Sequence, residues 1–258
     1  MLRGALPAGL LADPEPFDDL PPDEVPPDRS ATIPAPPARR RPRSLGEAAR
    51  RARTGPPAAE RTLPVPPALA GLLPDGLQRG STVGVAGPGA RSLALALIAE
   101  ATATGSWAAV VGDPDLGLAA AAEAGVALAR LAVVDPPDPA AWGAVVAALA
   151  GGLDLVLLAP RHRVRPADAR RLAARARERG AVLVRIGVGA GEGADASWPD
   201  RPDLELALGA AVWEGPEDGY GRLRRRRAEV VATGRGRNAR ERRATLLLPD
   251  TRGLPALP

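Results

Sequence analysis

Residues 81–101, which read STVGVAGPGARSLALALIAEA, join a β-type run to a helix through a glycine turn. The run Thr82–Ala86 predicts a strand, Gly87-Pro88-Gly89 forms the turn, and the leucine- and alanine-rich stretch that follows predicts a helix. A strand that passes through a glycine turn into a helix is the layout of a phosphate-binding loop. This segment therefore indicates an α/β fold organised around a loop of that kind.

The loop lacks the residues on which phosphate chemistry depends. A working loop has four residues between its two glycines, followed by Lys and then Ser or Thr. Gly87 and Gly89 are separated by one residue. Counting from Gly84 restores the spacing, but Ala90 and Arg91 then stand where Lys and the hydroxyl residue are needed. Because the Lys ammonium and the hydroxyl–Mg²⁺ contact carry phosphoryl transfer, we expect no nucleotide hydrolysis.

The start of the helix after the loop retains one property of a phosphate site. Backbone N–H groups and the helix dipole favour an anion there, and Arg91 in the first turn could cradle a phosphate. The candidate cofactor-binding residues are therefore the remnant of the loop, although we expect no ATP and no metal. The remnant consists of Gly87, Gly89, Arg91 and Ser92.

Composition excludes several kinds of active site. The chain has no Lys and no Cys, and its single His, His162, stands among arginines. A catalytic Lys, a thiolate metal site and a Cys nucleophile are therefore impossible, and the common His-based metal sites and triads lack their residues. We interpret His162 as structural or solvent-facing. The chain shows no secretion-type leader and no apolar run of about 18 residues, so we expect a cytoplasmic protein without a membrane partner.

The first 62 residues differ in composition from the rest. Sixteen of the thirty prolines lie within the first 67 residues. Such a segment buries too little apolar surface to offset the entropy lost on ordering. Residues 1–28 have a net charge of −6, from seven acids and one Arg, whereas residues 29–61 have +7, from nine Arg and two Glu. We predict a disordered, Pro/Arg-rich extension over residues 1–62.

From Leu63 onward the pattern is regular. Short apolar runs alternate with helical stretches, which predicts a parallel, doubly wound sheet. Three later segments, at 203–208, 221–233 and 243–249, predict antiparallel strands that extend it. We place one domain over residues 63–250 and a short tail over residues 251–258. The predicted strands are 82–86, 107–111, 131–134, 153–159 and 181–186, and the predicted helices are 91–104, 116–128 with a break near Gly125, 139–149 and 166–179.

The order and spacing of these segments resemble the ATPase core of the RecA recombinase over about Leu63 to Asp250. The matching motifs are the Gly87-Pro88 opening of the loop, the LALALIAEA helix, the AGVALARLAVVDPPD segment and the LDLVLLAP strand. The resemblance implies a RecA-like, three-layer α/β fold. Its sheet would be mostly parallel, with an antiparallel extension at the C-terminal end.

Among RecA-like proteins, the chain resembles the actinobacterial ImuA-prime accessory proteins, which have RecA-like and SulA-like ancestry. The motifs are the opening LPVPPALAGLLPDGLQRGSTV, the block GSWAAVVGDPDLGLAAAAEAGVALARLAVV and the arginine-rich RAEVVATGRG. The resemblance implies DNA damage tolerance, that is, SOS-induced translesion DNA synthesis and mutagenesis. The family works there with ImuB, a Y-family-like protein, and with an error-prone C-family polymerase.

Two further catalytic positions of RecA are not matched. The strand at 153–159 should end in an Asp that holds the Mg²⁺ water, but Ala159-Pro160 stands there. A Glu that activates the attacking water should follow the second strand, where Pro114 stands between Asp113 and Asp115. The resemblance therefore implies an adaptor that is not an enzyme. Two alternatives stay open: a nucleotide-binding RecA-like ATPase or recombinase regulator, and a SulA-like cell-division inhibitor.

Two segments are rich in arginine: residues 161–185 have nine Arg against two acids, and residues 222–243 have ten against two. Each is either a surface that follows DNA phosphates or a solvated helix face and a charged edge strand. Neither contains an aromatic side chain, which argues against the usual gripping of a single strand. Trp198 is a candidate interface residue, since Trp is enriched at interfaces. The candidate partner or DNA patch is Arg222, Arg224, Arg225, Arg226 and Arg227.

Overall fold

The computed structural model describes residues 61–136, 138–187, 198–215 and 220–258. These residues belong to one compact unit, Pro34–Pro258. The predicted extension, up to Glu60, lies outside the described residues. None of the helices in the described ranges combines the length and the apolar character that crossing a membrane requires.

The predicted alternation of strands and helices from Thr82 to Ile186 is confirmed. The helix predicted at 116–128 is shorter, because Gly125 adopts a left-handed φ of 91° and ends it. A 3-10 turn, η2 (Leu128–Arg130), then leads into the next strand. The other elements are β3 (Thr82–Ala86), α3 (Ala90–Ala103), β4 (Ala108–Val111), α4 (Leu118–Glu123), β5 (Leu131–Val134), α5 (Pro139–Gly152), β6 (Leu155–Leu158), α6 (Pro166–Arg179) and β7 (Val182–Ile186).

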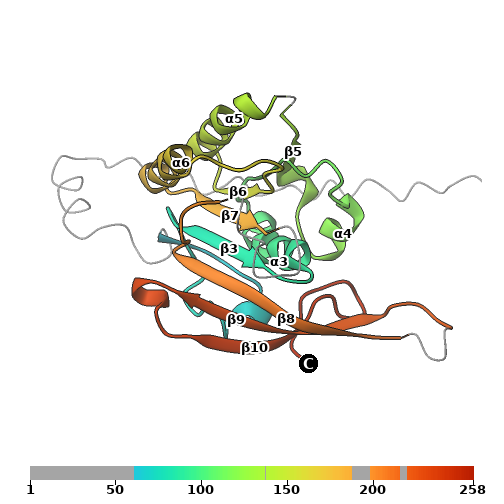
Figure 1. Cartoon of the computed structure of the whole chain (residues 1–258). Coiled ribbons are helices and arrows are strands. Elements are labelled where there is room, and N and C mark those ends of the chain that lie inside the picture. The colour runs from blue at the N-terminus through green and yellow to red at the C-terminus, as the bar shows by residue number, and fades with distance from the viewer. Residues whose placement is uncertain (1–60, 137, 188–197, 216–219) are drawn as a thin grey trace, which may run out of the picture. The chain divides into compact units, whose positions relative to one another are not determined.

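Eight strands form one sheet in the order β10-β9-β8-β3-β7-β6-β4-β5 (Figure 1). All neighbours from β8 (Leu204–Glu214) to β5 run parallel. β9 (Arg225–Gly234) is antiparallel to β8 and to β10 (Arg242–Leu247). The expectation of three antiparallel strands is therefore corrected for β8, which is antiparallel to β9 but parallel to β3. The fold is a mostly parallel α/β sheet with an antiparallel extension, as predicted.

Helices cover both faces of the sheet, which gives three layers (Figure 1). Successive residues of a strand point to opposite faces. In β6, Leu155 and Leu157 belong to the apolar cluster that contains α3, whereas Val156 and Leu158 belong to the cluster under α5 and α6. Because both faces of the central strands are buried, these strands read as continuous apolar runs in the sequence.

The segment before β3 covers part of the first cluster. β1 (Thr62–Leu63) pairs antiparallel with β2 (Leu77–Gln78), and the helical turn η1 (Pro67–Leu69) lies between them. Four leucines of this segment are almost fully buried, so it belongs to the core of the domain. They are Leu63, Leu69, Leu72 and Leu77.

The last residues of the chain return to β10. Ala256 forms a bridge with Leu247, and the Asp250 carboxylate accepts hydrogen bonds from the backbone N–H groups of Arg252 (2.8 Å) and Leu254 (2.9 Å). Burial by itself would raise the pKa of Asp250, but these hydrogen bonds and the Arg252 guanidinium hold that pKa below its ordinary value. Residues 251–258 are therefore fixed in place by a turn.

Substituting one central strand residue tests this layering. Leu157→Ala should lower the free energy of unfolding by about 2–5 kcal/mol, because it leaves a cavity in a fully buried part of the sheet. Leu118→Ala is the control, since Leu118 begins α4 and is 49% exposed. Urea unfolding followed by tryptophan fluorescence measures both. Equal unfolding midpoints for the two variants would contradict the assignment of Leu157 to the core.

Candidate functional site

The loop between β3 and α3 is a turn of three residues. Gly87 (φ 99°) and Gly89 (φ 88°) both adopt left-handed conformations that favour glycine. A Cβ at Gly87 would overlap the carbonyl oxygen of Leu208 in β8. Gly89 caps α3, and no side chain donates or accepts a capping hydrogen bond there. The structure therefore brings the predicted remnant together at the start of α3, with Arg91 and Ser92 in its first turn.

Arg91 forms an ion pair with Asp113, the residue that follows Gly112 after β4. Nη2 of Arg91 donates to Oδ1 at 2.8 Å. Nε lies 2.7 Å from Oδ2, although that oxygen receives no well-aligned hydrogen bond. Asp113 is only 3% exposed, whereas the Arg91 side chain is about half exposed. Arg91 stands where a phosphate-binding loop has its Ser or Thr, and Asp113 lies after the second central strand, where the RecA resemblance leads us to look for a catalytic Glu. The ion pair joins these two positions.

The remaining acid of this region is also paired. Asp115 lies 3.4 Å from Nη2 of Arg161, and both side chains are exposed. β6 leads into Ala159-Pro160, so no carboxylate stands directly after that strand. Within the described ranges, no group of three or more His, Cys, Asp or Glu side chains could hold a metal ion. The geometry offers no carboxylate set for Mg²⁺ among these residues.

Arg226 was predicted to be part of an exposed patch, and this prediction is wrong. The residue is 7% exposed, and its guanidinium packs on Gly89, where a Cβ would overlap it. Nε donates to the carbonyl of Leu248 at 2.7 Å, and the guanidinium carbon lies 5.5 Å from the centre of the Trp213 ring. Burial lowers the pKa of Arg226. Strand register explains the position, because Trp213 and Arg226 are opposite each other in β8 and β9.

The other arginines of the predicted patch divide into two groups. Arg225 and Arg227 both form ion pairs with Glu214. Nε of Arg225 lies 2.5 Å from Oε2, and Nη2 of Arg227 lies 3.8 Å from Oε1. Arg222 and Arg224 precede β9, are exposed and have no ion pair with another described residue. The expected edge strand is also corrected: β9 lies between β8 and β10, and β10 is the edge.

Aromatic side chains near this patch escaped the sequence analysis. Trp213 (42% exposed) and Tyr220 (83% exposed) flank the connection between β8 and β9, beside the exposed Val212 and Leu223. They lie just before the arginine-rich segment, so a search confined to residues 222–243 missed them. Tyr220 is close to Arg222 in the sequence, whereas the pairing of β8 with β9 places Trp213 opposite Arg226.

Trp198 was predicted to be an interface residue, but the structure places it in the core. It is 6% exposed, and its ring meets that of Trp142 edge-on at 6.3 Å. The guanidinium of Arg185 lies 5.5 Å from the ring centre of Trp198. His162 also packs edge-on against Trp142, at 5.3 Å, which agrees with a structural role.

Comparisons with known proteins support the fold and part of the sequence resemblance. The model of the MT3502 N-terminal domain matches residues 71–191. The uncharacterized protein Rv3395c of Mycobacterium tuberculosis is 51% identical over 105 residues, which are 40% of this chain and 50% of that protein. The match thus spans half the length of this curated relative. The crystal structure of the RadB recombinase aligns with a TM-score of 0.50 and 16% identity, over 74% of this chain and 97% of that one. The chain is therefore a RecA-like protein by fold, similar in sequence to a mycobacterial protein and to the MT3502 N-terminal domain.

Proposed function

We propose that this protein is a non-catalytic RecA-like adaptor in SOS-induced translesion DNA synthesis. It binds an ImuB-type, Y-family-like protein and, through it, an error-prone C-family polymerase. The observation that carries the non-catalytic part is the ion pair between Arg91 and Asp113 at the loop where a RecA-like ATPase would hold its nucleotide. The partners rest on the sequence motifs shared with the ImuA-prime proteins.

The ion pair supports this proposal because it engages both charges that nucleotide chemistry would need. Phosphoryl transfer requires a cation on the phosphates and a carboxylate on the metal or the attacking water. Here the buried Asp113 is held by Arg91, so neither is free. The guanidinium of Arg226 lies on Gly89 in addition, which fills the space beside the shortened loop. A domain whose loop is occupied by its own side chains in this way acts by binding partners.

An exposed apolar patch offers such a binding surface. The end of β8 carries Val212 and Trp213, which point to opposite faces of the strand, and the segment before β9 carries Tyr220 and Leu223 beside Arg222 and Arg224; all four apolar side chains are more than one-third exposed. Contiguous exposed apolar side chains mark interaction sites. Trp, Tyr and Arg are the residue types that most often dominate the binding energy of protein interfaces. We therefore place the partner on this β8–β9 arm, defined by residues 212–215 and 220–224.

The absence of catalysis has a direct test. Purified full-length protein with Mg²⁺ should show no saturable micromolar binding of a fluorescent ATP analogue. It should also release no phosphate above a blank without protein, whether or not DNA is present. Micromolar affinity that disappears in Gly89→Ala or Arg91→Ala would instead establish a nucleotide site and support the ATPase alternative.

The ion pair should be structural, and a double-mutant cycle measures this. Arg91→Met should lower the free energy of unfolding by about 1–3 kcal/mol, because Asp113 is left buried without a cation. Adding Asp113→Asn should restore much of that loss, since a neutral amide needs no counter-charge. Denaturant unfolding of the wild type, both single variants and the double variant gives the coupling. If the stability losses of the two single variants add up to the loss of the double variant within about 0.5 kcal/mol, the ion pair contributes no stability.

The β8–β9 arm should hold the partner protein. Tyr220→Ala combined with Leu223→Ala should weaken binding of the ImuB-type protein about tenfold or more, because exposed contact residues are lost without disturbing the core. Leu118→Ala, an equally exposed leucine on α4, is the matched control. Titration calorimetry or a quantitative pull-down gives the affinities. If the arm variant and the control bind alike, the arm is not the contact surface; binding by residues 1–62 alone would assign the contact to the extension.

A further inference from the structure

The last turn of α6 lies against the connection between β2 and β3. The backbone N–H of Gly80 donates to the carbonyl of Ala181 at 3.1 Å, and a Cβ at Gly80 would lie 3.0 Å from the Cα of Arg177. Arg79 reaches the carbonyl of Gly180 at 3.4 Å through Nη1. Because β3 and β7 begin here, this contact is at the amino-end edge of the parallel strands. The carboxyl ends, with the closed loop, are at the opposite edge.

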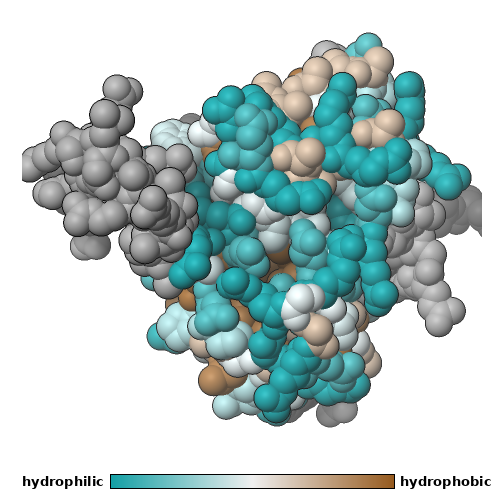
Figure 2. All heavy atoms as spheres, turned by 90° about the vertical axis from the view of Figure 1, so that its left-hand side faces the viewer, coloured by the Kyte–Doolittle hydropathy of each residue, from teal (hydrophilic) through white to brown (hydrophobic). Residues whose placement is uncertain are grey.

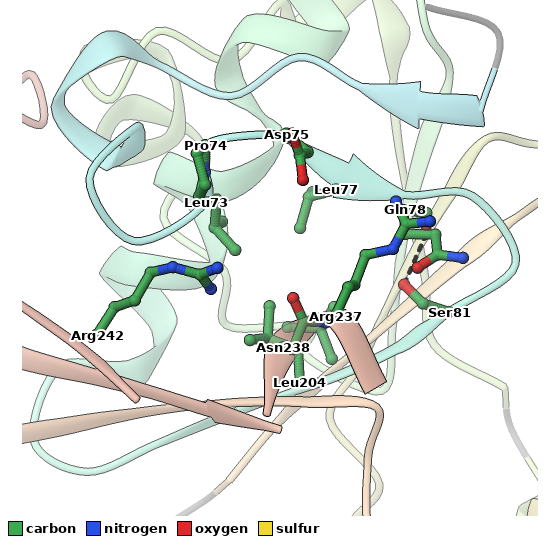
Figure 3. A pocket seen from close by; sticks show the side chains of 12 residues that line it. Leu73, Pro74, Asp75, Leu77, Gln78, Ser81, Leu204, Arg237, Asn238 and Arg242 are labelled. Atoms are coloured by element: carbon green, nitrogen blue, oxygen red, sulfur yellow. Dashed lines mark hydrogen bonds between the residues drawn. The ribbon is translucent and has the colours of Figure 1, made fainter. Parts of the chain in front are cut away.

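The turn between β9 and β10 adjoins the same connection on its other side. A hollow there is lined by Gln78 and Ser81 and by Arg237, Asn238 and Arg242 from the β9–β10 turn, which contains η3 (Gly236–Asn238). Figure 3 shows Arg242 and Arg237 on two sides of the hollow, with the Arg237 guanidinium beside Gln78 and with Leu73, Leu77 and Leu204 among the other lining residues. Two arginine-rich segments that are about 60 residues apart in sequence, around Arg177 and Arg237, thus meet at one edge of the sheet.

Most carboxylates at this edge are already engaged. Asp154 pairs with Arg79 at 2.7 Å. Asp203 accepts hydrogen bonds from the N–H and the hydroxyl of Thr82, both at 2.9 Å. Glu178 pairs with Arg175 at 3.1 Å, and Glu241 with Arg243 at 2.8 Å. Of the described carboxylates considered at this edge, these contacts leave Asp75, beside the hollow, to set against the remaining arginines.

Several arginines at this edge have no carboxylate partner among the described residues, and four of them belong to the last turn of α6 and to residues 237–242. Arg177, Arg237 and Arg240 are exposed and Arg242 is half-buried. Together with the one negative charge of Asp75, these four arginines have a net charge of +3. Figure 2 shows this side of the molecule, where hydrophilic residues cover much of the surface that is not grey. We name Arg177, Arg237, Arg240 and Arg242 the amino-edge arginines.

We propose that the amino-edge arginines bind the phosphate backbone of duplex DNA. Guanidinium groups match phosphate oxygens in geometry and charge, and each phosphate neutralised releases a counterion. Trp107, the exposed aromatic residue just before β4, has the Arg130 guanidinium 5.0 Å from its ring centre, so one face of this ring is covered and not free for base stacking. Contacts to phosphates without stacking favour a duplex over a single strand. This proposal does not depend on the adaptor role, because it uses the opposite edge of the sheet.

The salt dependence of binding identifies the contacts. With about four phosphates neutralised, the logarithm of the association constant should fall against the logarithm of salt concentration with a slope of roughly −3 to −4 from this surface. Residues 29–61 carry nine further arginines, which add a background that is the same in every variant. Differences between variants of the full chain therefore report the amino-edge arginines alone.

The experiment is fluorescence anisotropy of a labelled 25-base-pair duplex, titrated with the full-length protein at several salt concentrations. The triple variant Arg237→Gln/Arg240→Gln/Arg242→Gln should bind at least tenfold more weakly at low salt, with the slope reduced by about 3. Arg177→Gln, from a different element, should reduce the slope by about 1. The control Arg163→Gln/Arg165→Gln changes two exposed arginines between β6 and α6 that have no ion pair with another described residue, and it should bind as the wild type does. Thermal melting monitors the folding of each variant.

Several results would overturn the proposal. Unchanged affinity and slope in the triple variant would show that the amino-edge arginines do not touch DNA. An equal loss in the control variant would show that any unpaired arginine matters as much as these. Tighter binding of the single strand than of the duplex would reject the duplex assignment. Competition by poly-glutamate as effective as that of unlabelled duplex would indicate an acidic protein as the ligand. A failure of partner binding through the arm would leave all these DNA results unaffected.

Discussion

The short turn between β3 and α3 determines what the carboxyl ends of the central strands can do. Three residues reverse the chain from strand to helix, and two of them are glycines with positive φ. Side chains at these glycines would overlap the Leu208 carbonyl and the Arg226 guanidinium. A turn this short lets β8 and β9 close against the start of α3. The protein itself thus fills the space that a longer phosphate-binding loop would surround.

The charged groups around this turn belong to the chain itself: the amino end of α3, Arg226, Arg91 and Asp113. The amino end of α3 carries the positive end of the helix dipole, and Arg226 adds a buried guanidinium beside it. Such an arrangement is unfavourable unless a negative group is near. Arg91, in the first turn of α3, pairs with the buried Asp113 carboxylate, so a negative charge of the chain itself lies at this helix end and is balanced by Arg91. Within this pair the two charges compensate each other.

Local patterns predicted most of the elements but not the way they pair. Apolar runs and helix-ending glycines are local, so the central strands and α6 (Pro166–Arg179) appear where they were predicted. The direction of β8 is not local: its alternating pattern fits a parallel or an antiparallel neighbour equally. The burial of Arg226 depends on its register opposite Trp213, and that of Trp198 depends on packing against Trp142. Residues that sequence composition marks as surface arginines or interface tryptophans can thus become core residues once strands pair.

The two proposed surfaces lie at opposite ends of β9, which bears on how an adaptor of this kind works. Tyr220 and Leu223 precede the strand, whereas Arg237 and Arg240 follow it. Its ten residues, at about 3.4 Å each, separate the two ends by roughly 30 Å. A protein on the β8–β9 arm and a duplex on the amino-edge arginines would therefore not compete for the same space. β9 carries Arg226, whose guanidinium lies on Gly89, and the same strand joins the two proposed surfaces, so the packing of the short turn and the separation of the proposed partners depend on one strand.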